Sequence, residues 1–360
     1  MSFNPIDQQK SGPHRRTSRM VAVGGVQIGG GAPVSVQTML AEDPHDANAI
    51  CARIESCAEA EADIVRLTVP DAAAADTLRE VTRKSPLPIV ADVHFDYRCA
   101  LAAIEAGAHG LRINPGNIGG RERVQAVARA AKARRIPIRV GVNGGSLEPG
   151  ETLASSALKH MKLLEDEGFR DIVVSVKASD VATTVAAYRE LAERTDVPLH
   201  LGVTEAGTFL RGTVHSCVAM GILLADGIGD TLRVSLTDEP EREVAVGLEV
   251  LRALGLRRRG PSVTSCPTCG RTKCDVRGTA ERVEAALGKL AAANRVLPRV
   301  AIMGCAVNGP GEAEGADVAL CGGDGEFLLY EGGVATGKVE ESRAADAVIA
   351  AVKRWMTDNK

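Results

Sequence analysis

Aromatic residues are scarce in this chain of 360 residues: one Trp, three Tyr and five Phe make up 2% of it. So few rings leave few surfaces on which the bases of a nucleic acid could stack. The net charge of −3 and the pI near 6.2 also offer no basic surface to a phosphate backbone. No apolar run approaches the roughly 20 residues that a membrane span requires, and residues 1–14 contain no apolar segment of the kind found in a signal peptide. We therefore expect a cytoplasmic protein that binds neither nucleic acid nor a membrane.

The composition is otherwise that of an ordinary globular protein, with 45% apolar and 25% charged residues. A chain of this length can form one large domain and a smaller one. The stretch 257–261, Arg-Arg-Arg-Gly-Pro, interrupts the pattern of apolar runs and indicates a linker. We predict a first domain over residues 1–256 and a second over residues 257–360.

Eight apolar, β-branched runs alternate with Ala/Arg/Glu-rich segments that have helical spacing, such as 121–134 and 181–194. Strands alternating with helices of this length predict a parallel sheet. Eight such units in roughly 220 residues fit an α/β fold of the (β/α)8 TIM-barrel type. A doubly wound open sheet is the alternative, although no G-x-G-x-x-G follows an early strand to favour it. The runs are Val34–Met39, Ile64–Pro70, Pro88–Phe95, Gly110–Gly116, Pro137–Gly144, Asp171–Ser179, Pro198–Gly207 and Asp230–Thr237.

Polar residues occur in pairs within these runs, mostly two or four positions apart, which places both members on one face of a strand. We expect them at the C-terminal ends of the strands, where barrel enzymes carry their active sites. Buried charge is costly when unpaired, and four arginines and a lysine have only Asp92 and Glu205 as acidic candidates in the strands. The positive excess indicates an anion, and the planar fork of arginine suits phosphate oxygens. The charged members are Arg66, Asp92, Arg112, Arg139, Lys177, Glu205 and Arg233.

Two cysteine-bearing stretches, Ser-Cys-Pro-Thr-Cys-Gly at 265–270 and Met-Gly-Cys-Ala-Val-Asn-Gly-Pro-Gly-Glu at 303–312, predict a metal centre. Cys266 and Cys269 form a Cys-x-x-Cys pair, and Cys305 adds a third thiol on a glycine-rich turn. Three soft ligands suit an iron–sulfur cluster or zinc. Cys274 could complete a zinc site as a fourth thiol, and Cys321 is another spare thiol, so both metals remain open. Buried thiols explain the isolated Cys51, Cys57, Cys99 and Cys217.

The chain around this centre predicts a compact α+β domain. We expect a helix near 279–294, a strand near 299–303, short strands over 317–338 and a final helix from 342 to about 355. The cysteines then lie in the loops of the smaller domain.

The motifs Cys266-Pro-Thr-Cys269-Gly-Arg and Gly304-Cys305-x-x-Asn308-Gly-Pro-Gly-Glu312 resemble those of the bacterial 4-hydroxy-3-methylbut-2-enyl diphosphate synthases of the non-mevalonate isoprenoid pathway. The likeness extends over nearly the whole chain and is to the short bacterial form. It implies a [4Fe–4S] cluster held by Cys266, Cys269, Cys305 and Glu312. Cys274 departs from the family pattern, which usually has an apolar residue there.

The resemblance also implies a substrate and partners. The reaction would be ring opening and reductive dehydroxylation of 2-C-methyl-D-erythritol 2,4-cyclodiphosphate, with two electrons from flavodoxin or ferredoxin. The implied assembly is a head-to-tail homodimer. Motif positions that bind the cyclic diphosphate at the barrel mouth match Arg66, Asp92, Arg112, Asn114, Arg139, Asn143, Lys177, Thr204, Glu205, Arg233 and Ser235. Among these, we assign Glu205, at a strand end among cationic neighbours, as the candidate proton donor.

Two alternatives from other classes stay open. A barrel aldolase could use Lys177 as a Schiff base, with zinc only stabilising the C-terminal domain. An iron–sulfur electron carrier or sensor could use the barrel only to dock a partner. Zinc without sulfide would indicate the aldolase, and a cluster without diphosphate binding would indicate the carrier.

Overall fold

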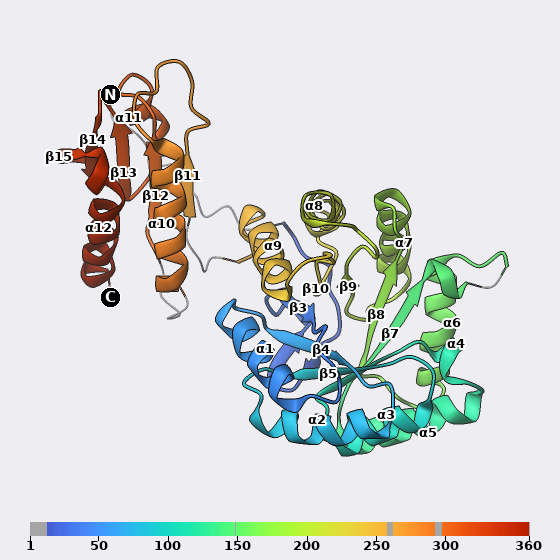
Figure 1. The fold of residues 1–360 in the computed structure, drawn as a ribbon. Helices are drawn as coiled ribbons and strands as arrows, with labels where there is room; N and C mark the ends of the chain where they lie inside the picture. The colour runs from blue at the N-terminus through green and yellow to red at the C-terminus, as the bar shows by residue number, and fades with distance from the viewer. Residues whose placement is uncertain (1–12, 148, 258–261, 292–296, 360) are drawn as a thin grey trace. The chain divides into compact units, whose positions relative to one another are not determined.

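The computed structural model describes residues 13–147, 149–257, 262–291 and 297–359 (Figure 1). The chain divides into two compact units, Met1–Arg257 and Arg258–Lys360. Arg257 ends the first unit, one residue after the predicted boundary, and its guanidinium hydrogen-bonds to the Asp63 carboxylate at 2.8 Å. The rest of the predicted linker, 258–261, lies outside the described residues. No helix of the described parts is both long and apolar enough to cross a membrane.

The first unit is a (β/α)8 barrel, as predicted, and the doubly wound alternative is wrong. Its eight parallel strands follow the order β8-β7-β6-β5-β4-β3-β10-β9, and a bridge between Val174 and Leu199 joins β8 to the segment before β9, which closes the sheet. The strands are β3 (Ser35–Met39), β4 (Ile64–Thr68), β5 (Ile89–Val93), β6 (Gly110–Ile113), β7 (Ile138–Asn143), β8 (Ile172–Lys177), β9 (His200–Leu201) and β10 (Thr231–Leu232). Each lies within one of the eight predicted runs.

Helices surround the strands (Figure 1). They are α1 (Ala47–Glu59), α2 (Ala72–Lys84), α3 (Tyr97–Glu105), α4 (Pro115–Ile118), α5 (Arg121–Arg134), α6 (Leu153–Glu165), α7 (Val181–Arg194), α8 (Phe209–Ala225) and α9 (Pro240–Ala253). Four of them begin directly after an aspartate whose carboxylate accepts a backbone N–H of the first turn, the usual N-cap interaction. These caps are Asp46, Asp71, Asp96 and Asp180. The caps fix where four of the βα loops end.

An antiparallel hairpin of β1 (Val21–Val23) and β2 (Val26–Ile28), which the sequence analysis did not predict, precedes the barrel. Its Val23 and Ile28 pack in one apolar cluster with Ile64 and Val90, which lie at the beginnings of β4 and β5. The hairpin therefore covers the N-terminal ends of the strands, and the C-terminal ends carry the loops.

The second unit contains a five-stranded mixed sheet in the order β11-β12-β13-β14-β15. The first three strands are parallel and the last two antiparallel to their neighbours. The strands are β11 (Ser262–Ser265), β12 (Arg299–Met303), β13 (Val318–Gly322), β14 (Glu326–Glu331) and β15 (Val334–Glu340), and the helices are α10 (Val276–Ala291), α11 (Gly309–Glu312) and α12 (Ala344–Asp358). Helices α10 and α12 pack on one face of the sheet through a core that includes Val283, Ile302 and Val348.

The predicted α+β unit is therefore present, with differences at element ends. Helix α10 begins three residues earlier than predicted, and residues 292–294 of the prediction lie outside the described residues. The final helix begins at Ala344, after a 3-10 turn over Glu341–Arg343, and continues to Asp358. Apolar spacing determines that a helix forms, whereas its ends depend on caps and turns.

Candidate active site

Asp92 on β5 is a buried acid of the inner wall of the barrel. It is 2% exposed, and its carboxylate lies 3.3 Å from Nε of Arg66 and 3.1 Å from Nη1 of Arg112, on the two neighbouring strands. Nε2 of His94 lies 3.3 Å from the same carboxylate. Burial would raise the pKa of Asp92, but the positive charge of Arg66 and the hydrogen bond from His94 outweigh it and hold the pKa below its usual range. Asp92 therefore stays ionised and orients two guanidiniums.

Glu243 on α9 is a second buried acid, which the sequence analysis missed. Its carboxylate accepts from Nη2 and Nε of Arg233 at 2.7 and 3.0 Å. Glu205, the other acidic candidate within the strand runs, is exposed and forms no ion pair with any described residue. The sequence signal that could have revealed Glu243 is a charged residue on the buried face of a helix. Pro240 and Gly247 lie on the same buried face of α9.

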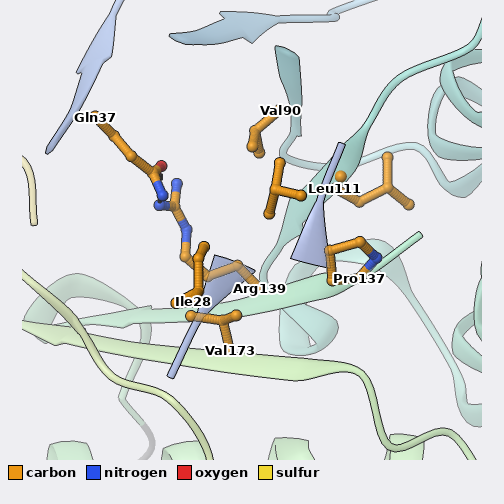
Figure 2. Close-up of a pocket in the computed structure, with 9 residues that line it drawn as sticks. Ile28, Gln37, Val90, Leu111, Pro137, Arg139 and Val173 are labelled. Carbon is orange, nitrogen blue, oxygen red and sulfur yellow. Dashed lines mark hydrogen bonds between the residues drawn. The ribbon is translucent and has the colours of Figure 1, made fainter. Parts of the chain in front are cut away.

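Arg139 on β7 lies inside the barrel, 5% exposed. Its Nη1 donates to Oε1 of Gln37 at 3.1 Å, and its Nε and Nη2 have no partner among the described residues (Figure 2). Arg139 borders a cavity of about 10 Å³, which is about the space of one water molecule. Val23 and Ile28 of the hairpin line the same cavity. We expected Arg139 at the C-terminal end of its strand, but it is the second residue of β7, which continues to Asn143.

Lys177 ends β8 and is half-buried, without a carboxylate partner among the described residues. Burial, followed by the positive charges of the surrounding arginines, holds its pKa well below the usual range. Two inward-facing glycines provide space for these cations. A Cβ on Gly202 would lie 2.5 Å from Nζ of Lys177, and a Cβ on Gly141 would lie 2.6 Å from Nε of Arg112.

The other predicted residues lie at or just beyond the strand ends. Asn114 is 3% exposed and its Oδ1 accepts from N of Gly116, so it caps α4. Asn143 ends β7 and is exposed, while Thr204 and Ser235 follow β9 and β10 and are half-buried. The loop after β9 also contains Glu205, whose φ is +53°.

The barrel interior therefore holds more positive than negative charge. The cations Arg66, Arg112, Arg139, Lys177 and Arg233 have Asp92 and Glu243 as their only buried carboxylate partners among the described residues. Burial, together with repulsion from neighbouring cations, lowers the pKa of Arg66 to about 10 and that of Arg139 well below its usual range. A multivalent anion would relieve this repulsion, and several arginine forks can bind phosphate oxygens.

His200 on β9 is fully buried, and neither ring nitrogen has a partner among the described residues. Burial, with the positive charges of Arg139 and Lys177, holds its pKa well below the usual range. It is therefore a neutral imidazole in the barrel interior.

The thiols of the second unit lie in the loops after two adjacent parallel strands. Cys266 follows β11, and its N–H donates to the carbonyl of Ile302 on β12, the strand that leads to Cys305. A Cβ on Gly304 would lie 2.7 Å from Oγ1 of Thr272, so the glycine lets the two thiol segments approach closely. The structure therefore brings together the two cysteine motifs that are separate in the sequence.

Two of these thiols are poised to ionise. Hydrogen bonds from the backbone and guanidinium of Arg271 lower the pKa of Cys269, and backbone N–H groups of Asn308 and Val307 lower that of Cys305. The negative charges of Cys269, Cys305 and Glu312 in turn raise the pKa of Arg271, so all three lie in its electrostatic range. Metals bind the thiolate form, so this donor set fits a metal centre. The described His, Cys, Asp and Glu side chains do not form a preassembled group of three around one point.

Cys274 and Cys321 differ from the motif thiols. Sγ of Cys274 donates to the carbonyls of Gly323 and Glu326 at 3.2 Å each, and burial raises its pKa. Burial also raises the pKa of Cys321 to about 11. Cys274 already has two hydrogen-bond acceptors within the core, which makes it a poor candidate for the fourth ligand.

A (β/α)8 barrel with a cationic inner wall, followed by an α+β unit in which two cysteine motifs lie together, defines a two-domain α/β protein. Sequence profiles identify the family. The profile of the GcpE TIM-barrel domain matches residues 18–248, and that of the GcpE protein C-terminal domain matches residues 262–354. The chain belongs to the GcpE family.

Curated relatives carry the name 4-hydroxy-3-methylbut-2-en-1-yl diphosphate synthase (flavodoxin). The chain is 51% identical to that of Geobacter sulfurreducens over 95% of this chain and 98% of the relative. The identity is 50% to the synthase of Lawsonia intracellularis, over 91% and 92% of the two chains, and 47% to that of Ruegeria pomeroyi, over 98% and 96%. The family resemblance drawn from the cysteine motifs is confirmed.

Solved structures with a similar fold include two dihydropteroate synthases. That of Yersinia pestis has a TM-score of 0.50 and 11% identity, over 66% of this chain and 97% of that chain. That of Xanthomonas albilineans in complex with 7,8-dihydropteroate has a TM-score of 0.50 and 16% identity, over 66% and 98%. At such low identity the likeness shows the barrel fold alone.

Proposed function

We propose that this protein forms 4-hydroxy-3-methylbut-2-en-1-yl diphosphate in the non-mevalonate pathway of isoprenoid biosynthesis. The observation that carries the proposal is the 51% identity to a synthase of that name along 95% of the chain. The substrate is 2-C-methyl-D-erythritol 2,4-cyclodiphosphate. The reaction opens the ring, removes one hydroxyl group as water, and consumes two electrons together with protons. This oxidoreductase function replaces the aldolase and electron-carrier alternatives.

The inner wall of the barrel binds the diphosphate in this proposal. Its excess of positive charge supports the assignment. Each charge-assisted hydrogen bond to phosphate contributes about 1.5–3 kcal/mol. The residues proposed to bind substrate are Arg66, Asp92, Arg112, Asn114, Arg139, Asn143, Lys177, Thr204, Arg233 and Ser235.

Glu205 is the proposed catalytic acid. A hydroxyl group leaves more easily as water, so the reaction needs a proton donor at that oxygen. Glu205 is exposed in the loop after β9, and its φ of +53° is unusual for a residue with a side chain. Such a conformation costs about 1–3 kcal/mol and is concentrated at functional sites. The strained backbone supports a role for this loop in the chemistry.

Cys266, Cys269, Cys305 and Glu312 are proposed to hold a [4Fe–4S] cluster. When bound, the cluster supplies electrons one at a time and an iron that can act as a Lewis acid. The lowered pKa values of Cys269 and Cys305 favour thiolates that bind iron. Glu312 would be the fourth ligand, and its hard carboxylate would bind iron less tightly than a fourth thiolate would.

The electron donor is proposed to be flavodoxin, with ferredoxin as the alternative, because the names of the relatives specify flavodoxin. The cytoplasm is the proposed compartment. All nine cysteines are free thiols, which a reducing compartment maintains.

A homodimer is the proposed assembly, and the outer face of α8 supports it. Leu210, Val214, Val218 and Ile222 recur every four residues along this helix and are 76%, 50%, 45% and 38% exposed. Residues at this spacing form one stripe on a helix. Apolar stripes of this kind typically lie in interfaces. The same stripe on α8 of a second copy is an apolar surface that would cover this one.

Anaerobic purification followed by turnover tests the proposed function. Purified protein should contain iron and acid-labile sulfide, and with a chemical reductant it should convert the cyclic diphosphate to 4-hydroxy-3-methylbut-2-en-1-yl diphosphate, detected by mass spectrometry. Zinc without sulfide would contradict the proposal. So would a complete cluster in a protein that neither binds nor converts the cyclic diphosphate.

A further inference from the structure

Glu243 is a buried acid of the barrel, and all of its hydrogen-bonding capacity is used. It is 2% exposed, in the first turn of α9. Oε1 accepts from Nη2 of Arg233 and from the backbone N of Leu236, at 2.7 and 3.0 Å. Oε2 accepts from Nε of Arg233 and from Oγ1 of Thr38, at 3.0 and 2.8 Å. A carboxylate has about four acceptor positions, so all of them are occupied.

These contacts hold Arg233 by one edge of its guanidinium. The edge formed by Nε and Nη2 faces Glu243, while Nη1 has no partner among the described residues. The second edge, formed by Nη1 and the other hydrogen of Nη2, therefore remains available. An arginine edge of this kind makes two parallel hydrogen bonds to a phosphate group.

The carboxylate itself cannot move easily. Thr38 belongs to β3 and Leu236 to the loop after β10, so donors from two further parts of the barrel fix the carboxylate of Glu243. Fixing a side chain before the ligand arrives reduces the conformational entropy lost on binding. Asp92 differs from Glu243 because its carboxylate is shared between two arginines, Arg66 and Arg112, and is not dedicated to one.

We propose that Glu243 is a positioning residue for diphosphate binding, which holds Arg233 with its free guanidinium edge available to the ligand. The inference rests on the proposed function, since it takes Arg233 as a diphosphate-binding residue. Glu243 itself does not touch the ligand. It makes Arg233 a preformed part of the site.

Calorimetric titration of the full-length holoprotein with inorganic diphosphate tests this role. Glu243→Gln keeps the shape of the side chain but replaces one acceptor oxygen by an NH2 group, so it should bind diphosphate about tenfold more weakly. It should raise KM for the cyclic diphosphate by a similar factor and change kcat less. Glu241→Gln is the matched control, because Glu241 lies in the same turn of α9 but pairs with Arg53 at 2.9 Å near the surface. The control should bind as the wild type does.

A double-mutant cycle separates positioning from a purely structural role. In the background of Arg233→Met, Glu243→Gln should weaken diphosphate binding no further, because the guanidinium that it positions is gone. Thr38→Val removes one donor to Oε2 and should weaken binding in the same direction but less. If Glu243→Gln lowers only the melting temperature and leaves diphosphate affinity unchanged, the positioning role is wrong. If Arg233→Met itself has no effect on affinity, the assignment of Arg233 to the diphosphate site fails instead.

Discussion

Gly141→Ala should disable the binding site through one added methyl group. Gly141 faces the barrel interior from β7, and the added Cβ would lie 2.6 Å from Nε, 3.0 Å from Nη2 and 3.1 Å from Cζ of Arg112. Contacts this short cannot persist, so the guanidinium must move away. Its hydrogen bond to Asp92, 3.1 Å in the wild type, is then lost.

The size of the effect follows from that displacement. A charge-assisted hydrogen bond contributes about 1.5–3 kcal/mol, so removing Arg112 from the ligand should weaken diphosphate binding about ten- to a hundredfold. Stability should change little, because Ala costs less chain entropy than Gly by about 0.5–1 kcal/mol, which offsets part of the lost ion pair. The loss should therefore appear in affinity more than in the melting temperature.

The assay is titration with inorganic diphosphate beside thermal unfolding of the same samples. Gly144→Ala is the matched control, since a Cβ there meets no atom within 4 Å. It should leave both affinity and melting temperature unchanged. Wild-type affinity in Gly141→Ala would refute the reasoning, because Arg112 could not then be binding the ligand from its present position.

The metal centre and the oligomer give further tests. Replacing Cys266, Cys269 or Cys305 with Ser should abolish bound iron and acid-labile sulfide, whereas Cys51→Ser and Cys217→Ser should retain both. Cys274→Ala should keep the cluster and most activity while Glu312→Ala loses activity, and the reverse result would make Cys274 the fourth ligand. In iron-free protein at about pH 7, iodoacetamide should modify Cys305 faster than Cys51 by mass spectrometry. Both thiols are half-buried, but hydrogen bonds lower the pKa of Cys305 and burial raises that of Cys51. The two modification rates should therefore converge only as the pH rises. Equal rates at neutral pH would contradict the assignment of Cys305 as a metal ligand. Val218→Glu on α8 should shift dimers toward monomers in light scattering, whereas Val334→Glu, 67% exposed in the second unit, should not.

Local sequence determined the framework of this protein. The eight strands follow from short β-branched runs such as Ile89–Val93, all five of whose residues are buried, because periodicity and propensity act over a few neighbouring residues. The thiol motifs were equally visible, since Cys266 and Cys269 lie in one loop and Cys305 precedes a glycine-rich turn. Signals of this kind are contained within a few residues and can be read along the chain.

Partners across the fold were decided only by the tertiary structure. Asp92 and Glu205 were the acidic candidates visible within the strand runs, but the carboxylate that pairs with Arg233 is that of Glu243 on α9. The packing of that helix directs its buried face at the barrel. The spacing of Cys274 allowed a fourth metal ligand, yet its thiol meets carbonyls about fifty residues further along. The need for a glycine at position 141 likewise depends on the register of β6 against β7, because that register places the Arg112 side chain beside it. Such contacts join residues far apart in the chain, and they exist only once strand register and helix packing have set the positions of both side chains.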